Sequence, residues 1–314
     1  MDLLVLGVGL AASAATPGFW DWSLDPPLVL VIDLGILYWL GSRRTHASSR
    51  TARGRRWRHA CFYAGLAVLA IALASPIERL SEQLFWVHMV QHILLLVVAA
   101  PLIVLARPWV RLWRSLPLVA RRSLGRNFTR GRLLWLRRLG TALGRPLPSF
   151  VLFSCVVLIW HVPTLFDATL SSEALHALEH TLFFVTALMF WKHVIDSPPL
   201  HAPLSELQRV VYLVGAMVVM WLLAVVLALA PHPLYAAYYQ QVARPGGISA
   251  LADQQVAAGI MWVPGSITFV IVLFVYVQRW LAPAQAPRLT PEPATLIPES
   301  ASARAITSSL IGGH

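Results

Sequence analysis

The sequence has few charged residues, only two cysteines and a single lysine. Asp, Glu, Lys and Arg together make up 12% of its 314 residues, whereas about a quarter of the residues in ordinary soluble domains are charged. This shortage excludes an ordinary soluble domain. Cys61 and Cys155 stand far apart and form no CxxC motif. We therefore expect both to be small core residues rather than partners in a disulfide.

Long apolar stretches fill most of the chain, and 57% of all residues are hydrophobic. Seven stretches are long enough to cross a bilayer core, which takes about 20 residues. They lie at 24–41, 57–75, 83–106, 148–165, 175–195, 207–230 and 256–281, and the one at 148–165 is the shortest. Because backbone groups in lipid must be hydrogen-bonded within their own segment, these runs predict helices. The sequence therefore predicts an all-α integral membrane protein, a seven-transmembrane helix bundle that forms one domain over 24–281.

The positive charge is concentrated in two loops, although the net charge of +11 describes the whole chain. Arginines crowd the loop at 43–58 and the loop at 107–145, which follow the first and third predicted spans. By the positive-inside rule both loops are cytoplasmic. The alternation of seven spans then places the N-terminus outside and the C-terminus in the cytoplasm. Because the arginines lie beside predicted spans, the charge does not indicate a nucleic-acid partner; the predicted partner of these loops is the lipid bilayer.

The segments outside the predicted spans differ in composition. Residues 1–23 resemble the end of a signal peptide but lack a basic start, so we expect an outer N-terminal segment that is not cleaved. The cytoplasmic loop at 107–147 alternates arginines with tryptophans and leucines, which is typical of helices on the inner membrane surface. The tail at 282–314 is rich in Pro, Ala, Ser and Thr, and we expect it to be disordered. The outer loop at 231–255 carries three tyrosines and is long enough to fold over the mouth of the bundle.

Five histidines lie in or beside the apolar spans. His88 and His92 are four residues apart, as are His176 and His180, and His161 lies near the end of another span. The i,i+4 spacing places each pair on one helix face. With a rise of about 1.5 Å per residue and the topology above, His88, His161 and His180 fall within roughly 8 Å of the outer boundary. The sequence therefore predicts one outer-facing layer of imidazoles.

Such a layer predicts a metal site, because imidazole is the commonest biological ligand for copper, zinc and iron. Glu179 is expected to orient one ring as an outer acceptor. Met89, Met261 and Asp253 are further candidates, and a thioether would favour Cu(I). A single histidine within a span often serves instead as a hydrogen-bonding residue between helices, and this alternative stays open. The remaining histidines near or beyond the spans are expected on polar or basic surface: His46, His59, His193 and His201.

Several motifs resemble those of one known family. The run Trp86–Leu95, followed by Ala99–Ile103, resembles the third-helix motif of the CtaG-type cytochrome c oxidase assembly factors. Other segments similar to that family's signatures are Trp160–Pro163, His176–His180 with Phe183 and Phe184, and Asp253 with Gln254 through Met261 and Trp262. The resemblance covers about 20–281, without the arginine-rich loop and the tail. It implies a multi-pass protein of the bacterial plasma (inner) membrane that helps to mature a haem-copper oxidase of the caa type, at its copper centre, with oxidase subunits as partners.

The leading interpretation is a non-enzymatic assembly factor that holds copper at its outer face. One alternative is a haem-binding membrane electron-transfer protein, with His92 and His180 as axial ligands. Another is a membrane oxygenase with a dimetal site in a histidine box. Against it, such enzymes place more histidines, some of them adjacent, on the cytoplasmic side. A transporter would be expected to show an inverted repeat or paired broken helices, and neither is evident.

Overall fold

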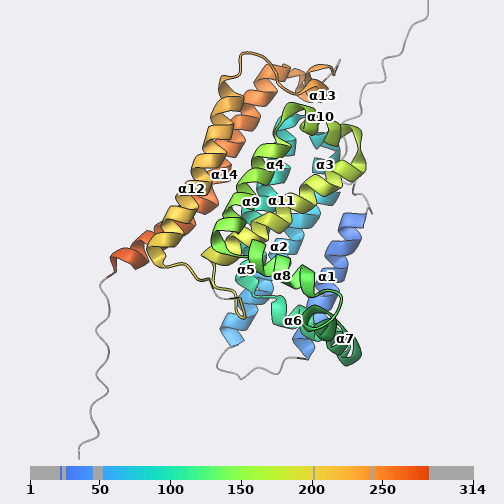
Figure 1. Ribbon diagram of the computed structural model, residues 1–314. Coiled ribbons are helices and arrows are strands. Elements are labelled where there is room, and N and C mark those ends of the chain that lie inside the picture. Colours follow the sequence, from blue (N-terminus) through green and yellow to red (C-terminus); the bar gives the residue numbers. More distant parts are fainter. Residues whose placement is uncertain (1–21, 23–25, 45–51, 201, 242–243, 283–314) are drawn as a thin grey trace, which may run out of the picture. The chain divides into compact units, whose positions relative to one another are not determined.

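The computed structural model describes residues 22, 26–44, 52–200, 202–241 and 244–282 (Figure 1). Within these ranges the ordered elements are helices, as the apolar runs predict. The expectations about the N-terminal segment, the tail, His46 and His201 lie outside the described residues. The helices belong to one compact unit that ends at Trp280, so the bundle is described here by itself.

Each of the seven predicted spans coincides with helical structure. These helices are α1 (Pro26–Arg43), α2 (Ala52–Ala74), α4–η2–α5 (Phe85–Ala106), α9 (Pro146–Trp160), α11 (Glu173–Val194), α12 (Glu206–Leu229) and α14 (Ala250–Leu281). The stretch predicted at 148–165 is shorter than expected, because α9 ends at Trp160. Pro163 begins the next helix, and the residue before it, Val162, is extended, as is usual ahead of a proline.

Five of the described helices are long and apolar enough to cross a membrane: α2, α4–η2–α5, α11, α12 and α14. A sixth span results if α9 is counted with α8 (Leu134–Leu143), although the two meet at an angle of 84°. The helix α1 has 18 residues and carries Asp33 in its sequence. The structure thus supports five to six spans, where the sequence predicts seven.

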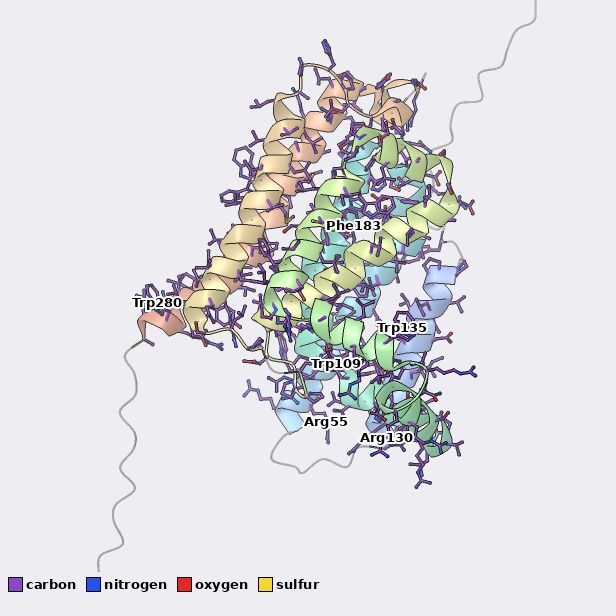
Figure 2. The ribbon with its side chains drawn as sticks, in the orientation of Figure 1. Arg55, Trp109, Arg130, Trp135, Phe183 and Trp280 are labelled. Carbon is purple, nitrogen blue, oxygen red and sulfur yellow. The ribbon has the colours of Figure 1, made fainter. Side chains whose placement is uncertain are left out.

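Short helices close the two ends of the bundle. At one end lie α3 (Pro76–Ser81), α10 (Pro163–Ser171) and α13 (Ala236–Tyr239), and at the other lie α6 (Trp109–Ser115), α7 (Leu118–Thr129) and α8 (Figure 1). We call these the histidine end and the arginine end. The predicted helices in the loop at 107–147 are present, and neither α7 nor α8 buries any residue. Figure 2 shows Arg55, Trp109, Arg130 and Trp135 at the arginine end.

The core consists of two apolar clusters. The larger one joins α4, α9, α11, α12 and α14, and the smaller one joins α1 and α2 to the span that contains α5. Where α4 passes into the π-helix η2 (Leu94–Ala99), the Leu96 carbonyl accepts a hydrogen bond of 2.8 Å from Trp191 Nε1. This bond ties α11 to the π-helical segment that directly follows the histidines of α4, and π-helical turns within α-helices are frequent at functional sites.

Two expectations about single residues are wrong. His193 was expected on a polar surface, but it is buried and its Nε2 lies 3.2 Å from Ser149 Oγ of α9. Cys155 was expected in the core, but its side chain is exposed, whereas Cys61 is buried as expected. Both differences concern which face of a helix meets a neighbour, which hydropathy alone does not encode.

Candidate metal centre

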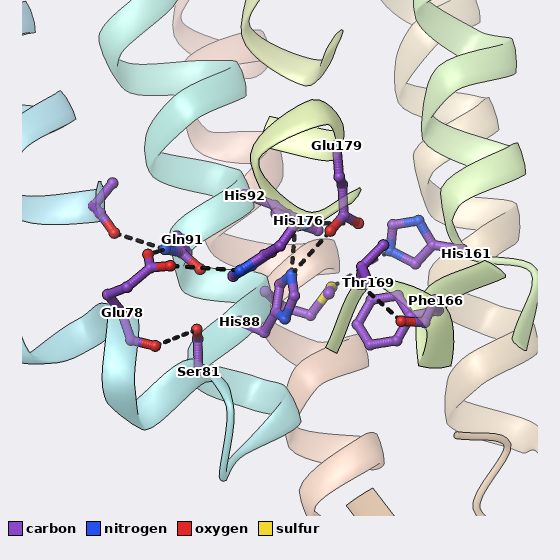
Figure 3. A network of polar contacts seen from close by, with 12 residues as sticks. Glu78, Ser81, His88, Gln91, His92, His161, Phe166, Thr169, His176 and Glu179 are labelled. Atoms are coloured by element: carbon purple, nitrogen blue, oxygen red, sulfur yellow. Dashed lines mark hydrogen bonds and ion pairs between the residues drawn. The ribbon is translucent and has the colours of Figure 1, made fainter. Parts of the chain in front are cut away.

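The histidine end brings all five predicted histidines together. His88 and His92 project from α4, His161 is the C-terminal cap of α9, and His176 and His180 lie in the first half of α11. All five are buried. Figure 3 shows four of them, with Glu179, around one small region between these helices. The predicted convergence is therefore present in the fold.

Two capping interactions set the starts of the helices that carry the pairs. The carboxylate of Asp253, from α14, accepts hydrogen bonds of 3.0 Å and 2.9 Å from the backbone N–H groups of Phe85 and Trp86. These are the first donors of α4, which have no partner within the helix. On α11, the hydroxyl of Ser172 accepts from the N–H of Leu175 at 3.4 Å, as an N-cap serine does.

The imidazole rings are close enough to share a ligand. Ring centroids lie 4.4 Å apart for His88 and His92, and 4.2 Å apart for His176 and His180. Between helices, the centroid of His88 lies 5.1 Å from that of His176, and the centroid of His92 lies 6.0 Å from that of His161. Each i,i+4 pair therefore faces the other pair, not lipid.

Four donor atoms form a compact group. His88, His176, Glu179 and His180 each offer one ligand atom, and these atoms all lie within 4.8 Å of one another. We call this group the four-donor set. Glu179, expected only as an outer acceptor, belongs to it: its carboxylate oxygens lie 3.6 Å from Nε2 of His88 and 3.6 Å from Nε2 of His92.

Hydrogen bonds around His88 fix its tautomer. The Tyr238 hydroxyl donates its one proton to the Ser81 carbonyl at 2.5 Å, and it lies 3.1 Å from Nδ1 of His88. Because that proton is already used, Nδ1 of His88 must be the donor in the second bond. In the neutral ring the lone pair is then on Nε2, the nitrogen that faces the cluster. Burial raises the pKa of Tyr238 well above its ordinary value, so the phenol stays protonated.

Two more histidines are held in the same way. Nδ1 of His161 lies 2.7 Å from the carbonyl of Val157, which can only accept. Nδ1 of His176 lies 3.4 Å from Oε1 of Glu78. In both residues the outer nitrogen is the donor and Nε2 keeps its lone pair, the arrangement that outer-shell partners impose on metal-binding histidines.

The cluster also contains buried polar atoms that have no hydrogen-bond partner among the described residues. These atoms are Nδ1 of His92, Nε2 of His176, Nε2 of His180 and both oxygens of Glu179. Leaving buried polar groups unsatisfied is costly, and almost all such groups in proteins have partners. Four of these atoms belong to residues of the four-donor set. A bound cation would satisfy them, so the residues present fit a metal ion.

The three further residues considered as metal ligands from the sequence, Met89, Met261 and Asp253, have different surroundings. Met89 is fully buried, and its Sδ lies 3.5 Å from Nε2 of His161. Met261 packs in the larger apolar cluster. Asp253 uses both oxygens to cap α4, as described above, and so positions the histidines of that helix.

Three residues of the site were not predicted from the sequence: Tyr238, Glu78 and Gln91. The amide nitrogen of Gln91 donates to the Ala72 carbonyl at 2.7 Å and also to the carboxylate of Glu78. Glu78 is thus held between Gln91 and His176. The tyrosines of the loop at 231–255 were the only signal for Tyr238, and nothing in the spacing distinguishes Glu78 from other acids at this end.

Comparisons with known proteins identify a family. The family model described as cytochrome c oxidase caa3 assembly factor (Caa3_CtaG) matches residues 36–282. An uncharacterized protein of Mycobacterium bovis and one of Mycobacterium tuberculosis are each 27% identical over 265 residues, which is 82% of this chain and 39% of the relative. One of Mycobacterium leprae is 25% identical over 268 residues, with 83% and 40% covered. The chain thus spans about two fifths of these relatives. No solved structure matches.

Proposed function

This chain belongs to the cytochrome c oxidase caa3 assembly factor family, and we propose that it supports maturation of an oxidase copper centre by holding a copper ion in its histidine cluster. The observation that carries the proposal is the four-donor set, in which Nε2 of His176, Nε2 of His180 and both oxygens of Glu179 have no hydrogen-bond partner among the described residues. Two helices, α4 and α11, hold these atoms in place before any ion arrives. Such preorganisation is what a metal site needs.

The donor types favour a transition metal. Imidazole suits copper, zinc, iron and nickel, and for a given site of nitrogen and oxygen donors copper binds most tightly among the divalent ions of the first row. Hard cations such as magnesium and calcium prefer oxygen ligands alone. A copper cargo also agrees with the family's description as an oxidase assembly factor, because the haem-copper oxidase that the resemblance implies contains copper. His88, His176, Glu179 and His180 would hold it, with His92 and His161 beside them.

The same proposal includes seven spans, with the histidine end outside and the C-terminus in the cytoplasm. The helix α1 would be the seventh span, because apolar side chains such as Leu30, Ile32 and Ile36 are exposed along it. Arginines gather at the opposite end of the bundle from the histidines, which supports a cytoplasmic arginine end. The histidine end of a bacterial plasma-membrane protein would then face the compartment outside the cytoplasm.

Haem is the second candidate, and the spacing of the rings argues against it. The ring centroids of His92 and His180 lie 5.4 Å apart. His88 lies 4.4 Å from the first and 5.8 Å from the second. A porphyrin placed between His92 and His180 would have to displace His88, and with it the hydrogen bond to Tyr238. A single metal ion needs no such displacement.

The proposed role is delivery rather than catalysis. A protein that delivers a metal ion must release it, so at least one of its ligands should be accessible to the receiving protein. His176 is the best placed, because Glu78 on its outer side has a side chain that is 25% exposed. Transfer would proceed by ligand exchange, in which one bond to the ion forms as another breaks and no electron is moved. Oxidase subunits are the proposed receivers.

Metal and haem analysis of the detergent-purified protein tests the proposal. Wild type from copper-replete cells should carry copper and no stoichiometric haem. A triple variant His88→Ala, His92→Ala, His180→Ala should lose the copper. The matched control is His193→Ala, because His193 is a buried histidine of α11 that lies near Ser149, outside the cluster. Full retention of copper by the triple variant would overturn the proposal, and so would a haem-loaded wild type.

A further inference from the structure

The contact between Met89 and His161 lies beside the four-donor set but is not part of it. Met89 follows His88 on α4, and His161 caps α9. The thioether Sδ and the ring nitrogen Nε2 lie 3.5 Å apart, and neither side chain is accessible beyond 7%. This pair therefore brings a soft sulfur donor and an imidazole donor together in a site closed to water.

Neither atom of this contact can donate a hydrogen bond to the other. The Nδ1 of His161 carries the ring proton, because it lies 2.7 Å from the Val157 carbonyl, which has no proton to give. Its Nε2 then offers only a lone pair, and a thioether sulfur has no proton either. Two acceptors thus face each other, and a cation between them would satisfy both.

The spacing matches that of two ligands on one ion. Metal–nitrogen and metal–sulfur bonds are about 2.0 Å and 2.3 Å long, and donors at those lengths that subtend a tetrahedral angle are about 3.5 Å apart. The two atoms already have this separation. Among first-row ions, thioether donors select Cu(I). We propose that Met89 Sδ and His161 Nε2 form a second, softer position that binds Cu(I) next to the four-donor set.

His92 is placed to serve both positions. Its ring centroid lies 6.0 Å from that of His161, and its Nδ1 has no hydrogen-bond partner among the residues described. Its Nε2 lies 3.6 Å from a Glu179 oxygen. The ring is therefore the third ligand of the soft position and the residue through which Cu(I), without change of oxidation state, would pass to or from the four-donor set. This inference rests on the proposed function and adds the oxidation state of the cargo.

The test compares two metal probes on Met89→Leu and on Met220→Leu. Leucine conserves volume in a core, and Met220 is a buried methionine of α12 that packs in the same cluster. Competition with bicinchoninate under reducing conditions measures Cu(I) affinity. The visible absorption of Co(II), a probe that prefers nitrogen and oxygen donors, reports on the four-donor set. Met89→Leu should weaken Cu(I) by about 10-fold or more and leave Co(II) unchanged, while Met220→Leu should change neither.

A second measurement keeps the inference testable if Met89→Leu does not fold. X-ray absorption at the copper edge of Cu(I)-loaded wild type should show one sulfur neighbour at about 2.3 Å, which persists in Met220→Leu and in a Cys61→Ser, Cys155→Ser double variant. No sulfur neighbour, or an unchanged Cu(I) affinity in Met89→Leu, would overturn the soft position and leave the proposed function standing if Co(II) or Cu(II) still binds. Failure of wild type to bind any of these ions would overturn both.

Discussion

The hydroxyl of Tyr238 lies 3.1 Å from Nδ1 of His88, although the two residues are 150 positions apart in the chain. Tyr238 belongs to α13, in the loop between the last two long helices, and its own proton goes to the Ser81 carbonyl. The loop thus fixes which nitrogen of His88 carries a proton. Through this bond the fold of the histidine end determines the chemistry of the cluster.

Tyr238→Phe should weaken metal binding while leaving the bundle folded. Without the hydroxyl, Nδ1 of His88 loses its acceptor and the ring is free to change tautomer. Loss of an outer-shell partner typically lowers metal affinity by about 10-fold to 100-fold. Copper affinity, measured by competition with a chromophoric chelator, checks this. Tyr239→Phe is the control, because Tyr239 is 46% exposed; an equal loss in both variants would contradict the assigned role.

Glu179→Gln should separate metal affinity from stability. The amide keeps the size of the side chain but removes the charge, so affinity for Co(II) or Cu(II) should fall by about 10-fold or more. Among the described residues, neither carboxylate oxygen of Glu179 has a geometric hydrogen-bond partner, so its neutral replacement should not lower the melting temperature. Binding isotherms and thermal unfolding in detergent measure the two quantities. Glu173→Gln, at an exposed position of the same helix, should change neither.

Asp253→Asn should lower stability by about 1–2 kcal/mol, the usual cost of a weakened helix cap. The carboxylate accepts from two backbone N–H groups at the start of α4, and the amide has one acceptor oxygen only. Because Asp253 positions α4 without entering the cluster, metal stoichiometry at saturation should stay that of wild type. Thermal unfolding beside metal analysis measures both effects. Glu173→Gln, at an exposed position at the start of α11, is the control that should leave stability unchanged.

The proposed orientation predicts which end of the bundle is reachable from outside the cell. In a background with Cys61 and Cys155 replaced by serine, a cysteine at Gln240 should react with a membrane-impermeant maleimide in intact cells. A cysteine at Arg130 should react only after lysis. Both positions are exposed; Gln240 caps the end of α13 at the histidine end, and Arg130 caps the end of α7 at the arginine end. The reverse pattern would place the histidine end in the cytoplasm and remove the basis for outward delivery.

Much of the fold follows from the order of the residues. The long helices could be located from the sequence because each one coincides with a long apolar run, and the length and composition of such a run can be read directly from the residues. The convergence of the five histidines follows because neighbouring spans run in alternate directions. The end of α9 at Trp160 was harder to place, since the apolar run continues past it and only Pro163 signals the break.

The partners of the cluster could not be predicted from spacing. Tyr238 reaches His88, and Asp253 caps α4, across more than 140 residues, and no local pattern encodes contacts of that range. His193 occupies an apolar helix face that happens to meet Ser149. Glu179 was expected only as an outer acceptor, because its place beside His180 in the sequence does not show that its carboxylate lies 3.6 Å from both His88 and His92.

The most direct test measures the copper-to-haem ratio of the caa-type oxidase purified from cells that lack this chain. If the histidine cluster delivers copper, wild type and His193→Ala, expressed at equal levels, should restore the ratio. The triple variant His88→Ala, His92→Ala, His180→Ala should leave the oxidase deficient in copper but not in haem. An oxidase with full copper content in cells that carry only the triple variant would contradict the account.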